Sequence, residues 1–550
     1  MTATGYVSTT GDARKVSKSG DVMTGELTLP DSSPDQALNA ASKGYVDGVA
    51  AGKAATLTQI IAGAGLSGGG TLAADRTLTV AYGSTSGTAA QGNDSRLSDA
   101  RTPLAHASTH AAAGSDPVTP AAIGAVASSD VPYTAGLYPP SRRLPQWRQP
   151  STITTQFQAG HGFTNNAGST YTANDTADFI LGTQAAKIVT GGTGAAANVS
   201  RTGMSAFDTT GKTVRLRLKI DDITHVAGIN LFLGNTSFAN TYKWIIQGGA
   251  AGSNLITSGE WVTVTLNWHD ATTTGSPARS GLTDVRLQIT DDATAAVTAH
   301  YQSVELIPDA SSIFPNGVVS ICFDDCWQSV WDNGKPRLDL YGYPASMYTI
   351  QDVLGSSGRL TLAELYTLQD RCGWEIASHA YTDADHSSTY TGLTAAQLDT
   401  DLRALKSWTL ANGFRGGDGT AYPLGQYGLT VDSQPTTNYV RRYFNYARTT
   451  NSKTKETFPP GDPFRLRAMS SISSSSGGYA PSSLTTATTG DLDKAKANGT
   501  WLILVFHKIV TGTPAATTEC AQSDFNSIVD GINSRGMPVI PIGDILKLYG

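Results

Sequence analysis

The sequence has few charged residues, few cysteines and no long apolar run, and each shortage excludes a class of protein. Only 15% of the 550 residues are charged and the formal net charge is -6, so the chain lacks the basic surface of a nucleic-acid-binding protein. Four cysteines are too few for a disulfide framework. No run of about 18 apolar residues occurs, so we expect no membrane insertion. The N-terminus lacks the basic head and apolar segment of a signal peptide.

The first quarter of the chain also lacks tryptophan and cysteine. All nine Trp lie at or after Trp147, and all four Cys lie beyond residue 320. Residues 1–135 are rich in Gly, Ala, Ser and Thr, which predicts an extended or oligomer-dependent segment rather than a compact monomer. Residues 136–146 contain the run Tyr138-Pro-Pro-Ser-Arg-Arg-Leu-Pro145, which predicts a stiff linker.

Residues 147–310 have the pattern of an antiparallel β-sandwich. Gly, Asn, Asp and Thr clusters separate short alternating strands, and no helix is expected between them. By analogy of fold alone, the segment is similar to carbohydrate-binding jelly rolls. Trp244, Trp261 and Trp268 either stack on sugar rings or fill the core of the sandwich. The expected strands include Val214–Ile220, Ile229–Leu233, Trp261–Trp268 and Val285–Thr290.

Residues 311–550 alternate strands with helices, which predicts a parallel α/β domain built as a barrel or distorted barrel of fewer than eight units. The runs Thr361-Leu-Ala-Glu364 and Thr394-Ala-Ala-Gln397 are capping boxes, each opening a helix. A closing strand is expected at Val539–Ile542. Leucines at helical spacing give each helix an apolar face: Leu362, Leu365 and Leu368 in the first, and Leu398, Leu402 and Leu405 in the second.

Three apolar segments of this region end in polar side chains. The run Val318-Val-Ser-Ile-Cys-Phe ends in Asp324 and Asp325, Gly373-Trp-Glu-Ile-Ala-Ser ends in His379, and Trp501-Leu-Ile-Leu-Val-Phe ends in His507. In parallel barrels the active site is assembled at the carboxyl ends of the strands. We therefore expect these acids and imidazoles to share one rim.

Aspartate pairs also occur at Asp221-Asp222 and Asp291-Asp292, so a pair alone is weak evidence of function. Those pairs follow alternating strands, and we expect them to be solvated strand ends. The strand before Asp324 does not alternate, which is typical of a strand buried on both faces. A functional site is therefore favoured at Asp324 and Asp325.

The C-terminal 240 residues or so resemble the polysaccharide deacetylases, metal-dependent carbohydrate esterases built on a distorted (β/α) barrel. The family motif Thr-Phe-Asp-Asp is matched by Cys322-Phe-Asp324-Asp325 except for its Thr. The resemblance implies that Asp324 is the general base and Asp325 a metal ligand. It also implies that His507, at the end of Leu504-Val-Phe-His507, is the general acid.

The second family motif, His followed by three residues and another His, is altered here. His379 is followed by Asp383 at the expected position and by His386 three residues later. Spacings of four and seven both return to one helical face, so either side chain could complete the set. Imidazole suits zinc, which favours His386 over Asp383 as the third ligand beside Asp325 and His379. We expect the cofactor to be a divalent metal, Zn²⁺.

The third motif is reduced to Tyr422-Pro-Leu-Gly425, which looks like a divergent branch of the family. By position, the backbone N–H of Leu424 is expected to donate to the oxyanion, and Tyr422 to lie in the substrate-binding wall. The arginine that orients the base in the family is absent from this motif. Arg467 resembles an arginine that the divergent branch supplies from a later loop, with a surface role as the alternative.

Two segments of the first quarter resemble bacteriophage tail fibres: Lys18–Pro30 followed by Ala41–Asp47, and Gly92–Pro103. In that family such segments attach the fibre to the virion and usually trimerise. His106 and His110 follow, at a spacing that could hold a metal on a helix, although a fibre surface is the simpler interpretation.

These patterns together predict a phage tail fibre or tailspike that removes acetyl groups, N-acetyl before O-acetyl, from host surface polysaccharide. The expected partners are that polysaccharide and, through the N-terminal region, other tail proteins. We expect a homotrimer located in the virion. The alternatives are a receptor-binding fibre with a degenerate barrel, and a glycosidase with two carboxylates flanking the bond.

Overall fold

The computed structural model describes residues 43–51, 58–86, 88–90, 153–248, 255–309 and 313–548. They belong to two compact units that divide at residue 123. His106, His110, the linker 136–146 and both tail-fibre-like segments, apart from the last few residues of Ala41–Asp47, lie outside the described residues.

The N-terminal unit contains short elements with little burial. β1 pairs with β3 and β2 with β4, both antiparallel. No described side chain between residues 58 and 90 is buried, and Ile61 and Tyr82 are 84% and 57% exposed. The elements are α1 (Lys43–Ala51), β1 (Gln59–Ile60), β2 (Leu66–Ser67), β3 (Gly70–Thr71) and β4 (Thr79–Val80).

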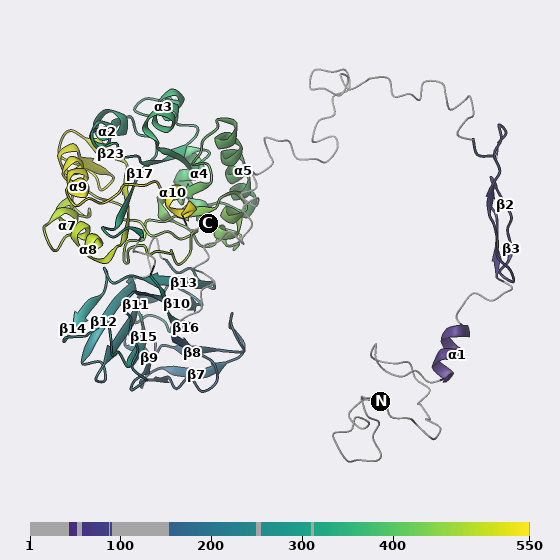
Figure 1. Cartoon of the computed structure of the whole chain (residues 1–550), viewed down its shortest axis with the longest axis horizontal. Coiled ribbons are helices and arrows are strands. Elements are labelled where there is room, and N and C mark those ends of the chain that lie inside the picture. Colours follow the sequence, from purple (N-terminus) through teal and green to yellow (C-terminus); the bar gives the residue numbers. More distant parts are fainter. Residues whose placement is uncertain are drawn as a thin grey trace, which may run out of the picture. The chain divides into compact units, whose positions relative to one another are not determined.

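The predicted antiparallel sheets are confirmed in the middle of the chain, where two six-stranded sheets pack face to face (Figure 1). The first has the order β13-β10-β16-β8-β7, with β5 also paired to β16, and the second β14-β12-β11-β15-β9-β6. The strands are β5 (Ile153–Gln156), β6 (Thr164–Asn165), β7 (Thr170–Asp175), β8 (Ala185–Val189), β9 (Ala196–Arg201), β10 (Lys212–Ile220), β11 (Val226–Asn235), β12 (Asn240–Gly248), β13 (Trp261–Leu266), β14 (Thr272–Thr274), β15 (Asp284–Asp291) and β16 (Thr298–Pro308).

The core of the sandwich is formed by the alternating apolar residues of these strands. In β10, Val214, Leu216, Leu218 and Ile220 are fully buried between the sheets. Trp244 is also fully buried and belongs to this core. Trp268 packs against the core beneath Arg279, whose Cζ lies 4.0 Å from the ring centroid.

One expectation for the sandwich is wrong. Asp291 is not a solvated strand end, because only 1% of it is exposed. Its carboxylate accepts hydrogen bonds from the backbone N–H groups of Gly192, Gly194 and Ala293. The aspartate thus holds a neighbouring loop, whereas Asp222 and Asp292 are exposed as expected.

The C-terminal part is built on six parallel strands in the order β21-β20-β19-β18-β17-β22. The edge strands β21 and β22 are joined through residues 466–469 by the parallel bridges Arg448↔Leu466 and Met469↔Leu504. The predicted closing strand at Val539 is reduced to the single bridge Val319↔Val539. The strands are β17 (Val318–Asp324), β18 (Ser346–Ile350), β19 (Glu375–Ala380), β20 (Gly419–Ala421), β21 (Tyr446–Arg448) and β22 (Trp501–Phe506), and a separate parallel pair is formed by β23 (Lys508–Val510) and β24 (Glu519–Ala521).

Helices cover the outside of this sheet (Figure 1). Both predicted capping boxes are confirmed, because the side chains of Thr361 and Thr394 accept from the third residue of α3 and α5. All three predicted leucines of α5 are buried, but Leu362 of α3 is 37% exposed. The helices are α2 (Lys335–Tyr341), α3 (Leu362–Cys372), α4 (Asp383–Ser388), α5 (Ala395–Ala411), α6 (Thr436–Tyr443), α7 (Pro481–Thr485), α8 (Asp491–Asn498), α9 (Gln522–Ser534) and α10 (Ile542–Lys547), with shorter turns η8 (Val330–Gly334), η9 (Tyr390–Gly392) and η10 (Pro423–Gly425).

No helix in the described part of the chain is long and apolar enough to cross a membrane.

Candidate active site

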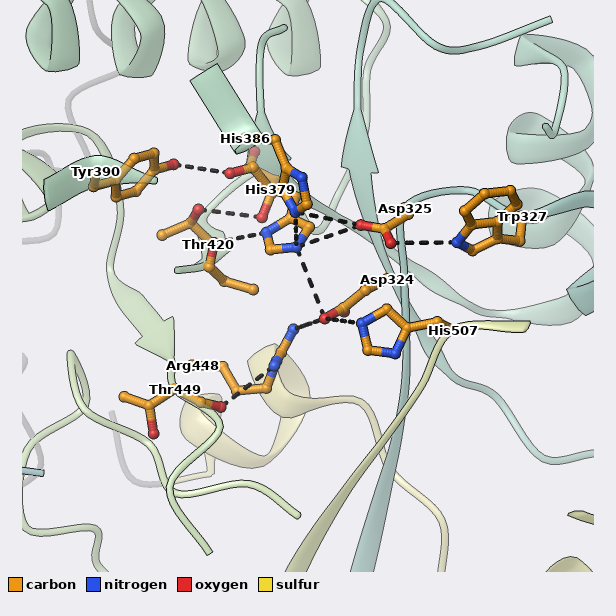
Figure 2. A network of polar contacts seen from close by, with 12 residues as sticks. Asp324, Asp325, Trp327, His379, His386, Tyr390, Thr420, Arg448, Thr449 and His507 are labelled. Atoms are coloured by element: carbon orange, nitrogen blue, oxygen red, sulfur yellow. Dashed lines mark hydrogen bonds and ion pairs between the residues drawn. The ribbon is translucent and has the colours of Figure 1, made fainter. Parts of the chain in front are cut away.

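The carboxyl ends of three strands bring the predicted acids and imidazoles together (Figure 2). All seven residues of β17 are buried, and this strand ends at Asp324. His379 lies near the end of β19, and His507 directly follows β22. The parallel pairing of Phe323 with Phe506 sets the end of β17 beside the end of β22. Residues more than 180 positions apart in the sequence thus meet at one edge of the sheet.

The backbone turns sharply after β17. Asp325 and Cys326 have φ angles of 70° and 58°, in the left-handed region that side chains with a Cβ rarely adopt. A left-handed backbone raises the conformational free energy by about 1–2 kcal/mol for each such residue, so the surrounding contacts must hold this turn. The turn separates the two carboxylates. Asp324 lies beside Arg448 and His507, and Asp325 lies beside His386. His379 lies between them, because its Nε2 is 3.8 Å from Asp324 Oδ2 and 3.7 Å from Asp325 Oδ1.

Three atoms at this edge have the spacing of a metal site. Asp325 Oδ1 lies 3.7 Å from His379 Nε2 and 3.4 Å from His386 Nε2, and the two nitrogens lie 3.2 Å apart. Ligands about 2.1 Å from a tetrahedral cation lie roughly 3.4 Å from one another. The three distances therefore fit one ion held by all three residues.

The hydrogen bonds of these residues fit the same cation. Asp325 Oδ1 is buried and accepts no hydrogen bond from any described residue. The His379 Nδ1–H donates to the carbonyl of Ala421 at 2.9 Å, which leaves the lone pair of Nε2 directed at the site. A carboxylate with two imidazoles suits Zn²⁺ and related divalent ions. An orphaned carboxylate oxygen beside two imidazole nitrogens is the environment that such an ion satisfies.

Of the two alternatives for the third ligand, His386 and not Asp383 lies beside Asp325 and His379. His386 lies in α4 and is 8% exposed, and its ring meets that of His379 at a centroid distance of 4.6 Å. Asp383 begins the same helix, but its side chain is exposed and its backbone N–H donates to Asp352. Thr382 is the N-cap of this helix, and its hydroxyl accepts from the N–H of Asp385.

The electrostatics keep His379 neutral. Burial, and then the neighbouring His386 imidazole, lower the pKa of His379 to about 4, although Asp324 and Asp325 act in the opposite direction. A neutral imidazole is the form that binds metal. The hydroxyl of Tyr390 donates to the carbonyl of His379 at 2.9 Å and so fixes the backbone of this residue.

Asp324 is paired with a buried arginine that the sequence did not indicate. Arg448 Nη2 donates to both carboxylate oxygens, at 2.6 and 2.7 Å, and the arginine is fully buried (Figure 2). Burial alone would raise the pKa of Asp324, but Arg448, with smaller contributions from His379 and His507, lowers it overall. Asp324 therefore stays ionised and able to accept a proton at neutral pH.

Arg467 does not take the role that the resemblance gave it, and it is not on the surface either. It is 3% exposed and donates to Glu456 Oε1 at 2.6 Å and to the carbonyl of Thr265 at 2.7 Å. Thr265 belongs to the sandwich, so Arg467 joins the sandwich to the barrel. Arg448 contacts Asp324 instead. The sequence did not point to Arg448, because it ends the three-residue strand Tyr446–Arg448, which is too short to show a hydrophobic period.

The other three predicted site residues, His507, Leu424 and Tyr422, differ in how deeply their side chains are buried. His507 is half-buried, and its Nε2 lies 3.9 Å from Asp324 Oδ2. Leu424 lies in η10 with a φ of 51°, and its side chain is 57% exposed. Tyr422 is fully buried, and its hydroxyl donates to the carbonyl of Phe464 at 3.0 Å, so this side chain packs in the core and does not line the substrate wall.

Comparison with known proteins agrees with this geometry. The family model described as polysaccharide deacetylase matches residues 312–440, which contain Asp324, Asp325, His379 and His386. This part of the chain is a polysaccharide deacetylase domain, of the hydrolase class. No curated protein matches the chain.

Solved structures with similar folds match separate parts of the chain. One is the Xyl-CE4 domain of a multidomain xylanase from the hindgut metagenome of Trinervitermes trinervoides, at 17% identity over 43% of this chain and 92% of that one, with a TM-score of 0.27. Another is a family 4 carbohydrate esterase from Streptomyces lividans in complex with acetate, at 17% identity over 41% and 92%, with a TM-score of 0.25. A third, described among carbohydrate-binding modules of the β-sandwich superfamily, has 14% identity and a TM-score of 0.22, and this chain spans 61% of its length.

We expect Zn²⁺ binding to depend on His386 and not on Asp383. The variant His386→Ala removes one of three ligands and should weaken Zn²⁺ binding at least 100-fold, whereas Asp383→Ala removes an exposed carboxylate and should leave it unchanged. Titration of metal-free protein against a chromophoric chelator measures both affinities. Loss of binding in Asp383→Ala alone would assign the ligand to Asp383.

Replacing Arg448 should reverse the pH dependence of stability that arises from Asp324. In the wild type the pKa of Asp324 is lowered, so its contribution to stability is present above pH 4 and is lost as the pH falls. In Arg448→Met the unpaired buried carboxyl has a raised pKa, and its ionisation opposes folding as the pH rises. The variant should be destabilised by about 3–5 kcal/mol at pH 8 and by less at pH 4.

Denaturant unfolding at several pH values tests this expectation. Arg442→Met is the control, because the Arg442 side chain is 54% exposed and pairs with Asp399 at the surface. An equal loss of stability for Arg448→Met at pH 4 and pH 8 would contradict the assignment of Arg448 to Asp324.

Proposed function

We propose that the C-terminal domain hydrolyses acetyl groups of a polysaccharide with the help of a bound divalent cation. The observation that carries the proposal is the meeting of Asp324, Asp325, His379, His386 and His507 at one edge of the parallel sheet, three of them at metal-ligand spacing. The family match to residues 312–440 supports the same reaction class. Hydrolysis of an acetamide or acetate ester needs an activated water, a stabilised oxyanion and a proton for the leaving group.

The protein's own groups supply the proton transfers. A cation on Asp325, His379 and His386 would polarise the acetyl carbonyl and make nearby water more acidic. Asp324, kept ionised by Arg448, is placed to accept a proton from the attacking water. His507 is half-buried beside Asp324 and would donate a proton to the departing sugar nitrogen or oxygen. The backbone N–H of Leu424 remains the proposed oxyanion donor.

We further propose that the substrate is a host surface glycan and that the chain is a phage tail fibre or tailspike located in the virion. The support is the resemblance of the first quarter to tail fibres. The lack of any buried residue in the described part of 58–90 adds to it, because exposed apolar side chains such as Ile61 and Tyr82 are expected to pack against other copies. The N-terminal region would also contact other tail proteins.

The catalytic proposal is tested by acetate release from an N-acetylated glucosamine oligomer and from an O-acetylated xylan. The zinc-loaded wild type should release acetate, and Asp324→Asn should reduce the rate by about 10²–10⁴, the usual contribution of a general base. The matched control is Asp544→Asn, an exposed carboxylate in α10. Glycan binding without acetate would favour the receptor-binding alternative. Shortened chains without acetate would favour a glycosidase.

The oligomeric proposal predicts the mass of the assembled protein. Sedimentation equilibrium of the full chain should give three times the 57.4 kDa of one copy. A mass of one or two copies that persists at high protein concentration would contradict the trimer and leave the catalytic proposal intact.

A further inference from the structure

The indole of Trp327, two residues after the metal-ligand candidate Asp325, contacts two cations. The Arg359 Cζ is 3.5 Å from the ring centroid, and the Lys508 Nζ is 4.2 Å from it. Both cations are close enough to the ring centroid for a cation–π contact. Trp327 is therefore held by two cation–π contacts.

Both the tryptophan and the arginine contact Asp325. Trp327 Nε1–H donates to Asp325 Oδ2 at 3.3 Å (Figure 2), and Arg359 Nη1–H donates to the backbone carbonyl of Asp325. Trp327 and Arg359 face each other across an antiparallel bridge, and the N–H of Leu360 donates to the carbonyl of Cys326 at 2.8 Å. The left-handed turn at Asp325 and Cys326 is thus held from the segment 358–360.

These contacts divide the two oxygens of the carboxylate between two tasks. The indole N–H occupies Oδ2, whereas Oδ1 is buried, has no hydrogen-bond donor among the described residues and lies closest to His379 and His386. A carboxylate fixed in this way offers one oxygen to a cation. Without the indole, the carboxylate could rotate about its terminal bond, which has a broad torsional minimum.

The same stack reaches the strand end that carries His507. Lys508 follows His507 directly. The backbone N–H of the next residue, Ile509, donates a hydrogen bond to the hydroxyl of Ser329 at 3.2 Å. Asn333 donates to the carbonyl of Ile509 at 2.6 Å. The chain after β22 is therefore attached to the chain after β17 through the stack and through these two hydrogen bonds.

We propose that Trp327 and Arg359 are positioning residues that set the Asp325 carboxylate for one-oxygen binding of the divalent cation, with Lys508 completing the stack from the His507 side. The inference rests on the metal site of the proposed function. Residues that hold a metal ligand by hydrogen bonds typically change metal affinity or activity 10–100-fold when they are replaced.

The experiment measures Zn²⁺ affinity by chelator competition, together with the thermal midpoint of the metal-free protein. Trp327→Phe keeps an aromatic ring for the stack and loses the N–H, and Arg359→Met keeps an apolar stem and loses the guanidinium. Each should weaken Zn²⁺ binding 10–100-fold, and Arg359→Lys, which keeps a charged donor, should recover part of the loss. The visible spectrum of the Co²⁺-loaded form should change in Trp327→Phe, because the coordination of Asp325 changes.

The chain provides a matched control. Arg279 stacks on Trp268 in the sandwich and donates to the carbonyl of Thr209 at 2.5 Å, so it has the same two kinds of contact away from the site. Arg279→Met should leave the Zn²⁺ affinity unchanged.

The outcomes separate the inference from the proposed function. If Trp327→Phe and Arg359→Met lower the thermal midpoint but bind Zn²⁺ as the wild type does, the residues are merely structural and the inference is wrong. If the wild type binds no Zn²⁺, the metal site and the inference both fail. If the wild type binds Zn²⁺ and the variants bind it weakly, the inference holds even when no acetate is released, and only the deacetylase proposal fails.

Discussion

The buried ion pair between Asp324 and Arg448 is the interaction on which the candidate site depends. Asp324 is 3% exposed, and a carboxylate this deeply buried would be neutral without a partner. Arg448 is fully buried, contacts both carboxylate oxygens and lies 4.7 Å from the ring centroid of Tyr348. Each charge makes the burial of the other tolerable. The pair also joins the ends of β17 and β21, which are not neighbours in the sheet.

The second acid of the site is held in a different way. Asp325 gains its position from a left-handed backbone turn, which is unfavourable on its own and is balanced by contacts from Trp327 and Arg359. The two carboxylates are adjacent in the sequence, yet one is neutralised by a guanidinium and the other is left with a buried oxygen between two imidazoles. This difference gives one acid the environment of a base and the other that of a metal ligand.

The sandwich is attached to the barrel through polar groups that are buried where the two meet. Arg467 contacts Glu456 and Thr265, Arg465 contacts Glu260, and His269 Nε2 lies 3.0 Å from Asp491 Oδ1. Buried pairs of this kind contribute little net stability, but they are costly to break because each partner would be left uncompensated. They therefore fix how the sandwich sits against the barrel.

Much of the fold could be predicted from local patterns. The six-residue, largely apolar run before Asp324, the alternation in β10 and the capping boxes at Thr361 and Thr394 each depend on structure formed within a few residues, and all three are confirmed. The expectation for Asp291 was wrong because its burial depends on a loop about 100 positions earlier, whose backbone N–H groups it binds.

The sequence by itself determined which strands end in acids and imidazoles, because the apolar period and the residue that breaks it are both local. Only the tertiary structure placed His386, and not Asp383, beside His379, because His386 is buried in α4 whereas the Asp383 side chain is exposed. It also decided that Arg448 and not Arg467 reaches Asp324. An arginine's partner is set by strand pairing and by the path of a long loop, and neither leaves a period in the sequence.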